Sequence, residues 1–486
     1  MFPGLRDRLT LLPLGLSAAR PVISPDGKTL IFSAEVAGQE NLYSWSLEEN
    51  PTKPPVAKQL TATNGGKGDV QFMPDSKSIV YLQDGHVMEL SLDNGQAKPI
   101  AVTAQYDVDF NVEKNVVFQE AWGDLHRRYY NPDFNGQNWD AIRTEFAPYI
   151  AGCQTEDELR ADISLMIGRL NSSHSGIGSP DHHAPVIGRL GLRFSRADYE
   201  AGHGLVVSEV IPLGPANVAG IQVGDRLLAV NGEEIGPATD LNALLEDTIG
   251  RRTVLKVATG SGAPRTVEVK PVNIDTEKEL LYRAWVEKKR AYVDKISGGK
   301  IGYVHMEAME GDSLKQLYLD LDAQNEAKEG VVVDIRDNEG GFVNGYAIDV
   351  FARKNYLELT PRGLPGAPAR QLLGQRALGK PTVLVTNQNT LSDGEDFTEG
   401  YEALHLGQVV GVPTGGWIIY TGGTRLIDGS SLRLPMIRVQ DIHGQTMEMH
   451  PRPVNVEVVR KPGETEDGTD SQLAAAVKVL LAQIGK

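Results

Sequence analysis

Three short, almost wholly apolar segments in the C-terminal half constrain the fold more than any other feature. They are residues 330–336, 382–386 and 408–412. Runs without polar alternation are typical of strands in a sheet whose two faces are both covered. Helix-like segments follow the first two runs. Residues 300–486 are therefore predicted to form an α/β domain.

A serine follows one of these strands and opens a helix, in the sequence Asn389-Thr390-Leu391-Ser392-Asp393-Gly394-Glu395. In an α/β domain, such a serine is exposed on a sharp turn at the carboxyl edge of the sheet. The free N–H groups and partial positive charge of the helix N-terminus can hold the oxyanion of a tetrahedral intermediate. The alternative is that Ser392 is only an N-cap with acidic residues in the first helical turn.

Paired glycines follow another strand, in the sequence Asp337-Asn338-Glu339-Gly340-Gly341-Phe342. Glycines before a helix let backbone N–H groups approach a ligand closely. The spacing fits neither a P-loop nor a dinucleotide-binding fingerprint, so an oxyanion donor is the better interpretation. The spacing does not decide between Gly340 and Gly341.

A serine nucleophile needs a base, which is usually histidine. His174 stands out among the ten histidines because it lies in a Ser/Gly-rich loop just after an amphipathic segment. The alternative is an ordinary surface histidine. The pair His182 and His183 suggests a metal, but no His-Glu-x-x-His spacing supports one, and no cofactor is expected. The single cysteine, Cys153, excludes internal disulfides, and its place between two helices argues against a thiol nucleophile.

Residues 111–178 are predicted to be helical. One apolar stripe contains Phe118, Trp122, Leu125 and Tyr129, and a second contains Trp139, Ile142, Phe146 and Tyr149. Thr155 and Glu158 form a capping box before a third helix. We expect Gly176 to end that helix, after Ser173 and His174. The aromatic side chains are interpreted as core.

Residues 186–272 alternate between apolar and polar and look like a PDZ domain. The resemblance rests on Gly191-Leu192-Arg193-Phe194, on Gly204-Leu205-Val206-Val207 and on the run from Val223 to Gly232. Such domains add a peptide strand to a sheet edge, and backbone N–H groups of the Gly-Leu-Arg-Phe loop usually receive the peptide's terminal carboxylate. The alternative is that this domain is only a structural spacer.

The N-terminal 105 residues are predicted to be all-β. Residues 23–32 and 72–81 are near-repeats, offset by 49 positions between Pro25 and Pro74. A Pro-Asp turn followed by a strand at this period is typical of a β-propeller blade. Because two blades cannot close a ring, we expect a shortened form of a larger propeller protein. The apolar run 9–16, after Arg6 and Arg8, is predicted to be a buried strand, with a weak signal-peptide core as the alternative.

Charge and hydropathy limit the partners. The net charge of −16 argues against nucleic acid or an anionic membrane surface as the main partner. Apolar residues make up 41% of the chain, which excludes wholesale disorder, but no run reaches the ~18 residues that span a bilayer. We therefore expect a cytoplasmic protein with no membrane partner, with the periplasm as the alternative location.

Together these segments resemble the tricorn-type branch of the C-terminal processing peptidases, a family of serine proteases known as S41. The order is the same over residues 111–460: a helical segment ending in a Ser-His loop, an inserted PDZ domain, and an α/β segment with the nucleophile. The stretches Glu120-Ala121-Trp122 and Asn138-Trp139-Asp140 also match. The resemblance implies four parts: a propeller-like remnant at 1–105, a helical subdomain at 106–185, the PDZ domain at 186–273 and an α/β (crotonase-like) catalytic subdomain at 274–486.

The family's catalytic group is a Ser-His-Ser-Glu tetrad. The resemblance places the nucleophile on Ser392, the base on His174 and its neighbouring serine on Ser173. The oxyanion donors fall on the N–H of Asp393 and of Gly340 or Gly341. A rival branch uses a lysine about 25 residues after the serine, but this chain has no lysine between 381 and 460, so His174 remains the base.

The tetrad glutamate falls on Glu448. The family pattern Glu-Asn-x-Gly-Val-x-Pro-Asp is altered here to Glu448-Met449-His450-Pro451-Arg452-Pro453-Val454-Asn455. The resemblance implies a serine peptidase that acts on peptides through an acyl-enzyme, and it allows a homo-oligomer. Two alternatives remain, a serine esterase on the same scaffold and an inactive PDZ peptide-binding protein. With an unperturbed imidazole as base, activity should rise with pH through roughly 6.5.

Overall fold

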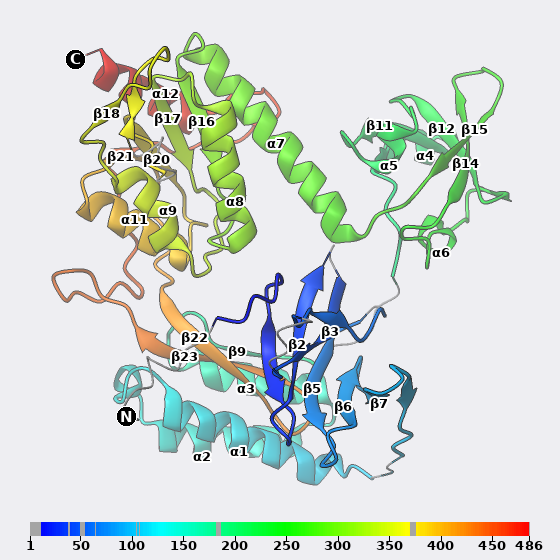
Figure 1. Cartoon of the computed structure of the whole chain (residues 1–486). Helices are drawn as coiled ribbons and strands as arrows, with labels where there is room; N and C mark the ends of the chain where they lie inside the picture. Colours follow the sequence, from blue (N-terminus) through cyan, green and yellow to red (C-terminus); the bar gives the residue numbers. More distant parts are fainter. Residues whose placement is uncertain are drawn as a thin grey trace. The chain divides into compact units, whose positions relative to one another are not determined.

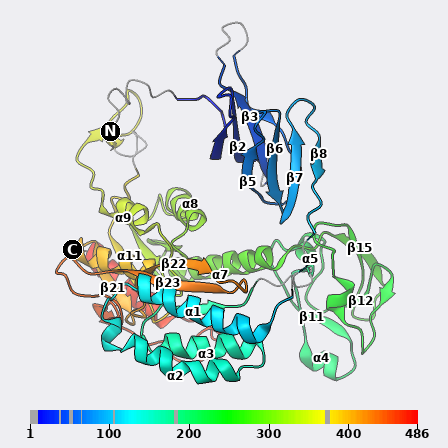
Figure 2. The same ribbon diagram turned by 90° about the horizontal axis from the view of Figure 1, so that it is seen from below.

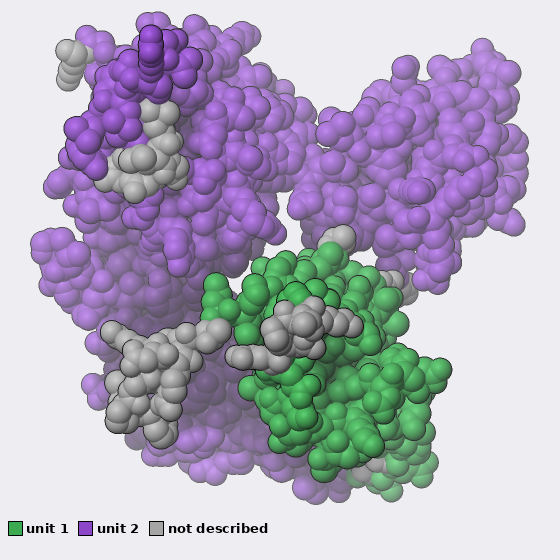
Figure 3. Space-filling view, in the orientation of Figure 1, with its two compact units in different colours: residues 1–108 green, residues 109–486 purple. Residues whose placement is uncertain are grey.

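The structure is a computed structural model, and it describes residues 11–36, 39–48, 54–63, 65–103, 105, 107–180, 186–369 and 376–485. The chain divides into two compact units, residues 1–108 and residues 109–486 (Figure 3). Among the described residues, no helix is both long enough and apolar enough to cross a membrane.

The first unit contains two four-stranded antiparallel sheets, each in simple sequential order (Figure 1). One comprises β1 (Ala19–Ile23), β2 (Thr29–Val36), β3 (Gln39–Ser46) and β4 (Lys58–Gln59), and the other β5 (Lys67–Phe72), β6 (Ser78–Gln83), β7 (His86–Ser91) and β8 (Ala97–Pro99). The repeated Pro-Asp turns connect β1 to β2 and β5 to β6. Ile31 and Leu42 of the first sheet share a buried cluster with Ile79, Tyr81 and Leu90 of the second.

The two sheets correspond to the two predicted blade-like repeats, and the described residues form no closed propeller. The prediction of a strand at 9–16 is wrong for residues 11–16, which the structure describes. Residues 11–16 have no strand structure, although Leu12, Leu14 and Leu16 pack against a core cluster of the first sheet. The run is apolar because it covers that sheet, which does not require it to pair as a strand. Residues 1–10 lie outside the described part.

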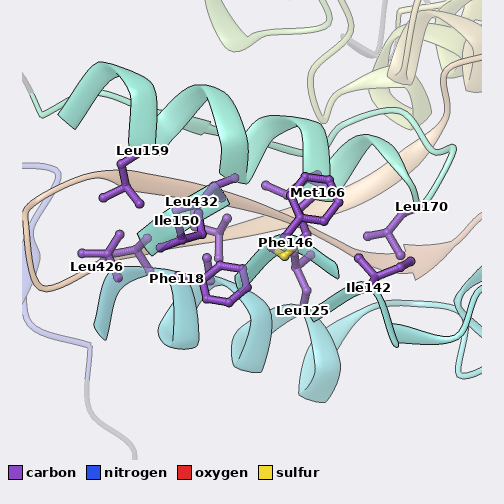
Figure 4. Packing of buried hydrophobic residues seen from close by; sticks show 14 of the residues in the cluster. Phe118, Leu125, Ile142, Phe146, Ile150, Leu159, Met166, Leu170, Leu426 and Leu432 are labelled. Atoms are coloured by element: carbon purple, nitrogen blue, oxygen red, sulfur yellow. The ribbon is translucent and has the colours of Figure 1, made fainter. Parts of the chain in front are cut away.

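The second unit begins with three helices, α1 (Phe110–Arg128), α2 (Trp139–Gly152) and α3 (Glu156–Gly168), with a short 3₁₀ turn at Phe134–Gly136. They pack on one face of a three-stranded sheet of β22 (Ile419–Arg425), β23 (Ser431–Arg438) and β9 (Gly176–Gly178) (Figure 2). Figure 4 shows the shared core, in which Leu426 and Leu432 meet Phe118, Phe146 and Leu159 of the helices. This packing attaches the end of α3 to a hairpin more than 250 residues later.

The capping prediction for α3 is close to what the structure has. Thr155 Oγ1 accepts from the Glu158 N–H at 3.2 Å, while Glu158 Oε2 accepts from the Gln154 N–H at 2.7 Å, one residue before the expected position. The predicted end of the helix is wrong. It ends at Gly168, and Gly176 instead begins β9. The loop between them therefore carries Ser173 and His174 away from the helix.

The PDZ-like segment forms a six-stranded sheet in the order β10-β11-β12-β14-β15, with β13 pairing β12. The strands are β10 (Leu192–Phe194), β11 (Leu205–Val210), β12 (Asp225–Val230), β13 (Glu233–Glu234), β14 (Thr253–Thr259) and β15 (Arg265–Val269). Three short helices accompany them, α4 (Arg196–Glu200), α5 (Pro215–Val218) and α6 (Leu241–Leu244). The strand β10 is at the end of the sheet order.

The remainder is an α/β domain, as predicted, and its five-stranded sheet is parallel, in the order β16-β17-β20-β21-β24. Its strands are β16 (Ile301–His305), β17 (Gly330–Asp334), β20 (Thr382–Thr386), β21 (Gly407–Gly411) and β24 (Val456–Glu457). The helices are α7 (Ile274–Ile296), α8 (Gly311–Leu319) with a π-helical turn (Asp320–Gln324), α9 (Asn344–Ala352), α11 (Asp393–Ala403) and α12 (Ser471–Ile484). A small ribbon pairs β18 (Glu358–Leu359) with β19 (Ala367–Pro368).

Helices cover both faces of this sheet. Val331 and Val333 of β17 pack with α8, α9 and α11, whereas Val332 packs with α7 and α12. Because alternate residues of the strand face opposite helical layers, Val331, Val332 and Val333 are all apolar. The loops that follow β17 and β20 therefore emerge together at the carboxyl edge, which is where the candidate site lies.

Candidate active site

Ser392 occupies the turn between β20 and α11. Its backbone has φ 54° and ψ −126°, and its N–H donates to Trp417 O at 2.9 Å. A non-glycine residue with positive φ costs about 1–3 kcal/mol and persists only where neighbours hold it. Ser392 makes no side-chain cap hydrogen bond, so it is not an ordinary N-cap serine. A strained strand-to-helix turn of this kind presents the serine Oγ outward.

Two backbone N–H groups near Ser392 have no partner among the described residues, those of Asp393 and Gly341. Gly340 is excluded as a donor because its N–H is already bonded to Asn338 Oδ1 at 2.9 Å. The role of Gly340 is steric, since an added Cβ would lie 2.4 Å from the Cβ of Ser392. Of the two glycines that the sequence left open, Gly341 is therefore the one whose N–H has no partner among the described residues.

A hydrogen-bond chain joins Glu448, Ser173 and His174. Ser173 Oγ donates to Glu448 Oε2 at 3.0 Å and lies 2.7 Å from His174 Nδ1. Glu448 also accepts from the Ser173 N–H at 2.7 Å and from the Ile418 N–H at 2.9 Å. Because the Ser173 hydroxyl has one proton and donates it to Glu448, it accepts from His174, which leaves His174 Nε2 free to accept a proton. The altered sequence after Glu448 thus does not prevent the Glu448 carboxylate from accepting a hydrogen bond from the Ser173 side chain.

No hydrogen bond joins Ser392 Oγ to His174 among the described residues. Catalytic hydrogen bonds are often long in unliganded sites and tighten when substrate binds. The Ser392 turn and the hydrogen-bond chain of Glu448, Ser173 and His174 nevertheless both contact the same short segment of backbone. Trp417 accepts from Ser392, and the next residue, Ile418, donates to Glu448.

Comparison with known proteins identifies the family. The family model of peptidase family S41 matches residues 300–458, that of the tricorn protease C1 domain matches 110–168, and that of the PDZ domain matches 206–259. The chain is 29% identical over 452 residues to tricorn protease homolog 1 of Streptomyces coelicolor, covering 88% of this chain and 42% of that protein. It is 31% identical over 399 residues to the putative tricorn-like protease C-terminal subunit of Sulfurisphaera tokodaii, covering 78% and 44%.

The crystal structure of the tricorn protease has the same fold, with a TM-score of 0.81 at 21% identity over 97% of this chain and 47% of that one. The chain carries peptidase family S41, tricorn C1 and PDZ domains, and it is similar to tricorn proteases over most of its length. The family and the PDZ domain predicted from the sequence are thereby confirmed. The chain spans less than half the length of these tricorn relatives.

His174, the candidate base, has an altered pKa. Burial, followed by the positive charge of Arg433, lowers the pKa of His174 to about 4. Arg433 lies on β23 directly opposite Gly176, two residues after His174, and its Nε donates to Thr421 Oγ1 at 3.4 Å. The imidazole is therefore neutral, and able to accept a proton, throughout the neutral range. The expectation of a midpoint near 6.5 for an unperturbed imidazole does not fit this environment.

This environment predicts the pH dependence of kcat/KM. Activity should be lost as pH falls through the pKa of His174, so the acid limb should lie well below the roughly 6.5 of free imidazole. Replacing Arg433 with methionine removes the neighbouring cation and should move that limb to higher pH. The charge that lowers the pKa of His174 is that of Arg433 on β23, and the Ser173 hydroxyl, which is bonded to Glu448, lies 2.7 Å from His174 Nδ1. Arg438→Met, on the same strand, is the matched control. If the acid limb of kcat/KM has its midpoint at about pH 6.5, the value of free imidazole, and Arg433→Met does not move that midpoint, this interpretation is contradicted.

The predicted peptide-binding loop lies at one edge of the PDZ-like sheet. Gly191 has φ 73°, and Leu192, Arg193 and Phe194 form the terminal strand β10. The Arg193 guanidinium is already paired with Glu277 of α7, at 3.2 and 3.3 Å. A peptide carboxylate at this loop would therefore meet backbone N–H groups, while Arg193 connects the PDZ-like sheet to α7.

Two further candidates from the sequence are Cys153 and the pair His182 and His183. Cys153 is buried, and burial, followed by a hydrogen bond to Asp162, raises the pKa of its thiol to about 11, which disfavours a thiolate. His182 and His183 lie outside the described residues. No group of three or more potential metal ligands occurs in the part of the chain that the structure describes.

Proposed function

We propose that this chain hydrolyses peptide bonds through an acyl-enzyme formed on Ser392. The observation that carries the proposal is the Glu448–Ser173–His174 hydrogen-bond chain, which leaves Nε2 of a neutral imidazole free to accept a proton. Ser392 also supports it, because its strained turn makes no side-chain cap hydrogen bond and the N–H groups of Asp393 and Gly341 have no partner among the described residues. A chain that had lost catalysis would have no need to keep all these groups.

The proposed first step is attack of Ser392 Oγ on the scissile carbonyl carbon while His174 Nε2 takes the hydroxyl proton. The carbonyl oxygen becomes an oxyanion and accepts from the N–H groups of Gly341 and Asp393. His174 then gives its proton to the leaving amine as the carbon–nitrogen bond breaks. Water attacks the acyl-enzyme with His174 again as base, which releases the acid and restores Ser392.

Glu448 and Ser173 orient the base in this proposal. They keep the proton of His174 on Nδ1, and the carboxylate stabilises the imidazolium that forms as Ser392 loses its proton. Peptides are the proposed substrates, since the relatives are named as proteases. The homo-oligomer and the cytoplasmic location expected from the sequence stay predictions.

The test is mass spectrometry of a mixed peptide library after incubation with the full chain. The proposal expects amide cleavage products with the wild type and none above background with Ser392→Ala. Esters of the same sequences, run in parallel, separate a peptidase from an esterase. Cleavage of the esters alone would support the esterase, and identical products from wild type and Ser392→Ala would overturn the assignment of the nucleophile.

The PDZ-like edge is proposed to hold the carboxyl end of the peptide. The position of β10 at the end of the sheet order, directly after Gly191, supports this proposal. Amidating a substrate's C-terminus should therefore raise KM and leave kcat nearly unchanged. The check is steady-state kinetics on paired free and amidated peptides. Equal constants for the two would favour a spacer role for this domain.

A further inference from the structure

Glu395 is a buried carboxylate of the candidate site that the proposed mechanism does not use. It lies in the first turn of α11, three residues after Ser392, and its side chain is fully buried. A buried carboxylate is costly unless it is fully hydrogen-bonded, so its partners indicate what it does. Sequence reasoning assigned it only to the acidic first turn of a helix.

The partners of Glu395 all belong to one short segment. Its Oε2 accepts from Thr414 Oγ1 at 2.6 Å and from the Gly416 N–H at 2.8 Å, and its Oε1 accepts from the Trp417 N–H at 2.6 Å. Two successive backbone N–H groups and a buried hydroxyl thus converge on one side chain. We call residues 416–418 the tie segment.

The tie segment contacts both halves of the candidate site. Its Trp417 carbonyl accepts from the Ser392 N–H at 2.9 Å, and its Ile418 N–H donates to Glu448 Oε2 at 2.9 Å. Its Gly416 carbonyl accepts from the N–H of Met449, the residue after Glu448, at 2.7 Å. The segment therefore holds the nucleophile turn on one side and the orienting acid on the other.

We propose that Glu395 is a positioning residue that fixes the tie segment and thereby keeps the strained Ser392 turn in register with the Glu448–Ser173–His174 chain. This rests on the proposed function. The backbone of Ser392 is held from both ends, because its carbonyl accepts from the Glu395 N–H at 2.7 Å while its N–H depends on Trp417, which the Glu395 side chain holds. Without that side chain, the tie segment loses its bonds to a carboxylate of α11.

The first test is Glu395→Gln, measured by steady-state kinetics on a peptide substrate. The amide would present two N–H donors where the carboxylate accepts three bonds, so at least one bond to the tie segment is lost. A shift of about 1 Å in a reacting group costs about 100-fold in rate. We expect kcat to fall by about that factor while KM changes little, since Glu395 does not contact the substrate.

The matched control is Glu399→Gln. Glu399 lies one turn further along α11, pairs with Arg452 at 2.9 Å, and has no bond to the tie segment. The substitution Glu399→Gln removes a similar carboxylate from the same helix and should leave kcat close to the wild-type value. Thr414→Val is the milder companion, since it removes one donor to Glu395 and should lower kcat by up to about tenfold. It keeps the proposal testable if Glu395→Gln does not fold.

A double variant separates positioning from simple stabilisation. If Glu395 acts through the tie segment, Glu395→Gln combined with Glu448→Gln should be less damaging than the product of the two single losses. A purely structural role predicts independent effects that multiply. Full activity in Ser392→Ala would refute the proposed function itself. Loss of activity in Ser392→Ala together with wild-type kcat in Glu395→Gln and Thr414→Val would refute only the role of Glu395.

Discussion

Ser392→Ala is expected to lower kcat by about 10⁴- to 10⁶-fold. The reason is that, in the proposed mechanism, the Ser392 hydroxyl is the group that forms the acyl-enzyme. The small residual rate would come from binding and from the oxyanion donors alone. The measurement is steady-state kinetics on a single fluorogenic peptide with a matched preparation of the wild type.

An expected KM and a control variant make this prediction more specific. KM should stay near the wild-type value, because the substrate is bound by its backbone and side chains before Ser392 attacks. Ser313→Ala, a serine in the first turn of α8, serves as the control for loss of a hydroxyl in the same domain and should retain wild-type kcat. Retention of full activity in Ser392→Ala would mean that another group is the nucleophile.

Glu448→Gln is expected to lower kcat by about 10²- to 10³-fold, less than the roughly 10⁴-fold lost when a triad loses an acid in direct contact with its histidine. Glu448 reaches His174 only through the Ser173 hydroxyl, so the serine attenuates its effect. The amide also presents donors where Glu448 now accepts three bonds. KM should change little, because the ground-state complex does not use this carboxylate.

The double variant with Ser173→Ala tests whether Glu448 acts through Ser173. Both residues belong to one hydrogen-bond chain, so the double variant should be little worse than the worse single. The measurement is kcat of the wild type, the two single variants and the double variant on one peptide. The four values give the interaction free energy between Glu448 and Ser173. Strict additivity of the two losses would place Glu448 outside the chain that orients His174.

The sequence alone was enough to predict the structural features that depend on local pattern. The continuous apolar runs predicted a sheet covered on both faces because alternate residues of β17 face two helical layers. The place of Ser392 just after such a run predicted that it lies at the sheet edge. The near-repeats predicted two matching antiparallel sheets because their Pro-Asp turns determine where each strand begins. These inferences needed only neighbours along the chain.

The sequence was insufficient where the outcome depends on tertiary contacts. The choice between Gly340 and Gly341 turns on the Asn338 side chain, which takes the Gly340 N–H. The pKa of His174 depends on burial and on Arg433, which β-pairing brings near it from a distant strand. Glu395 reads as a helix-turn acid in sequence, and only its three bonds to Thr414 and the tie segment indicate another role.

The most direct measurement of the central claim is covalent labelling with a fluorophosphonate probe, located by peptide mapping. An activated serine attacks the phosphorus because a neighbouring base takes its proton. We expect one adduct, on Ser392, and labelling that is much slower in His174→Ala. An adduct on a different residue, or equal labelling rates in wild type and His174→Ala, would contradict the assignment of Ser392 and His174 as nucleophile and base.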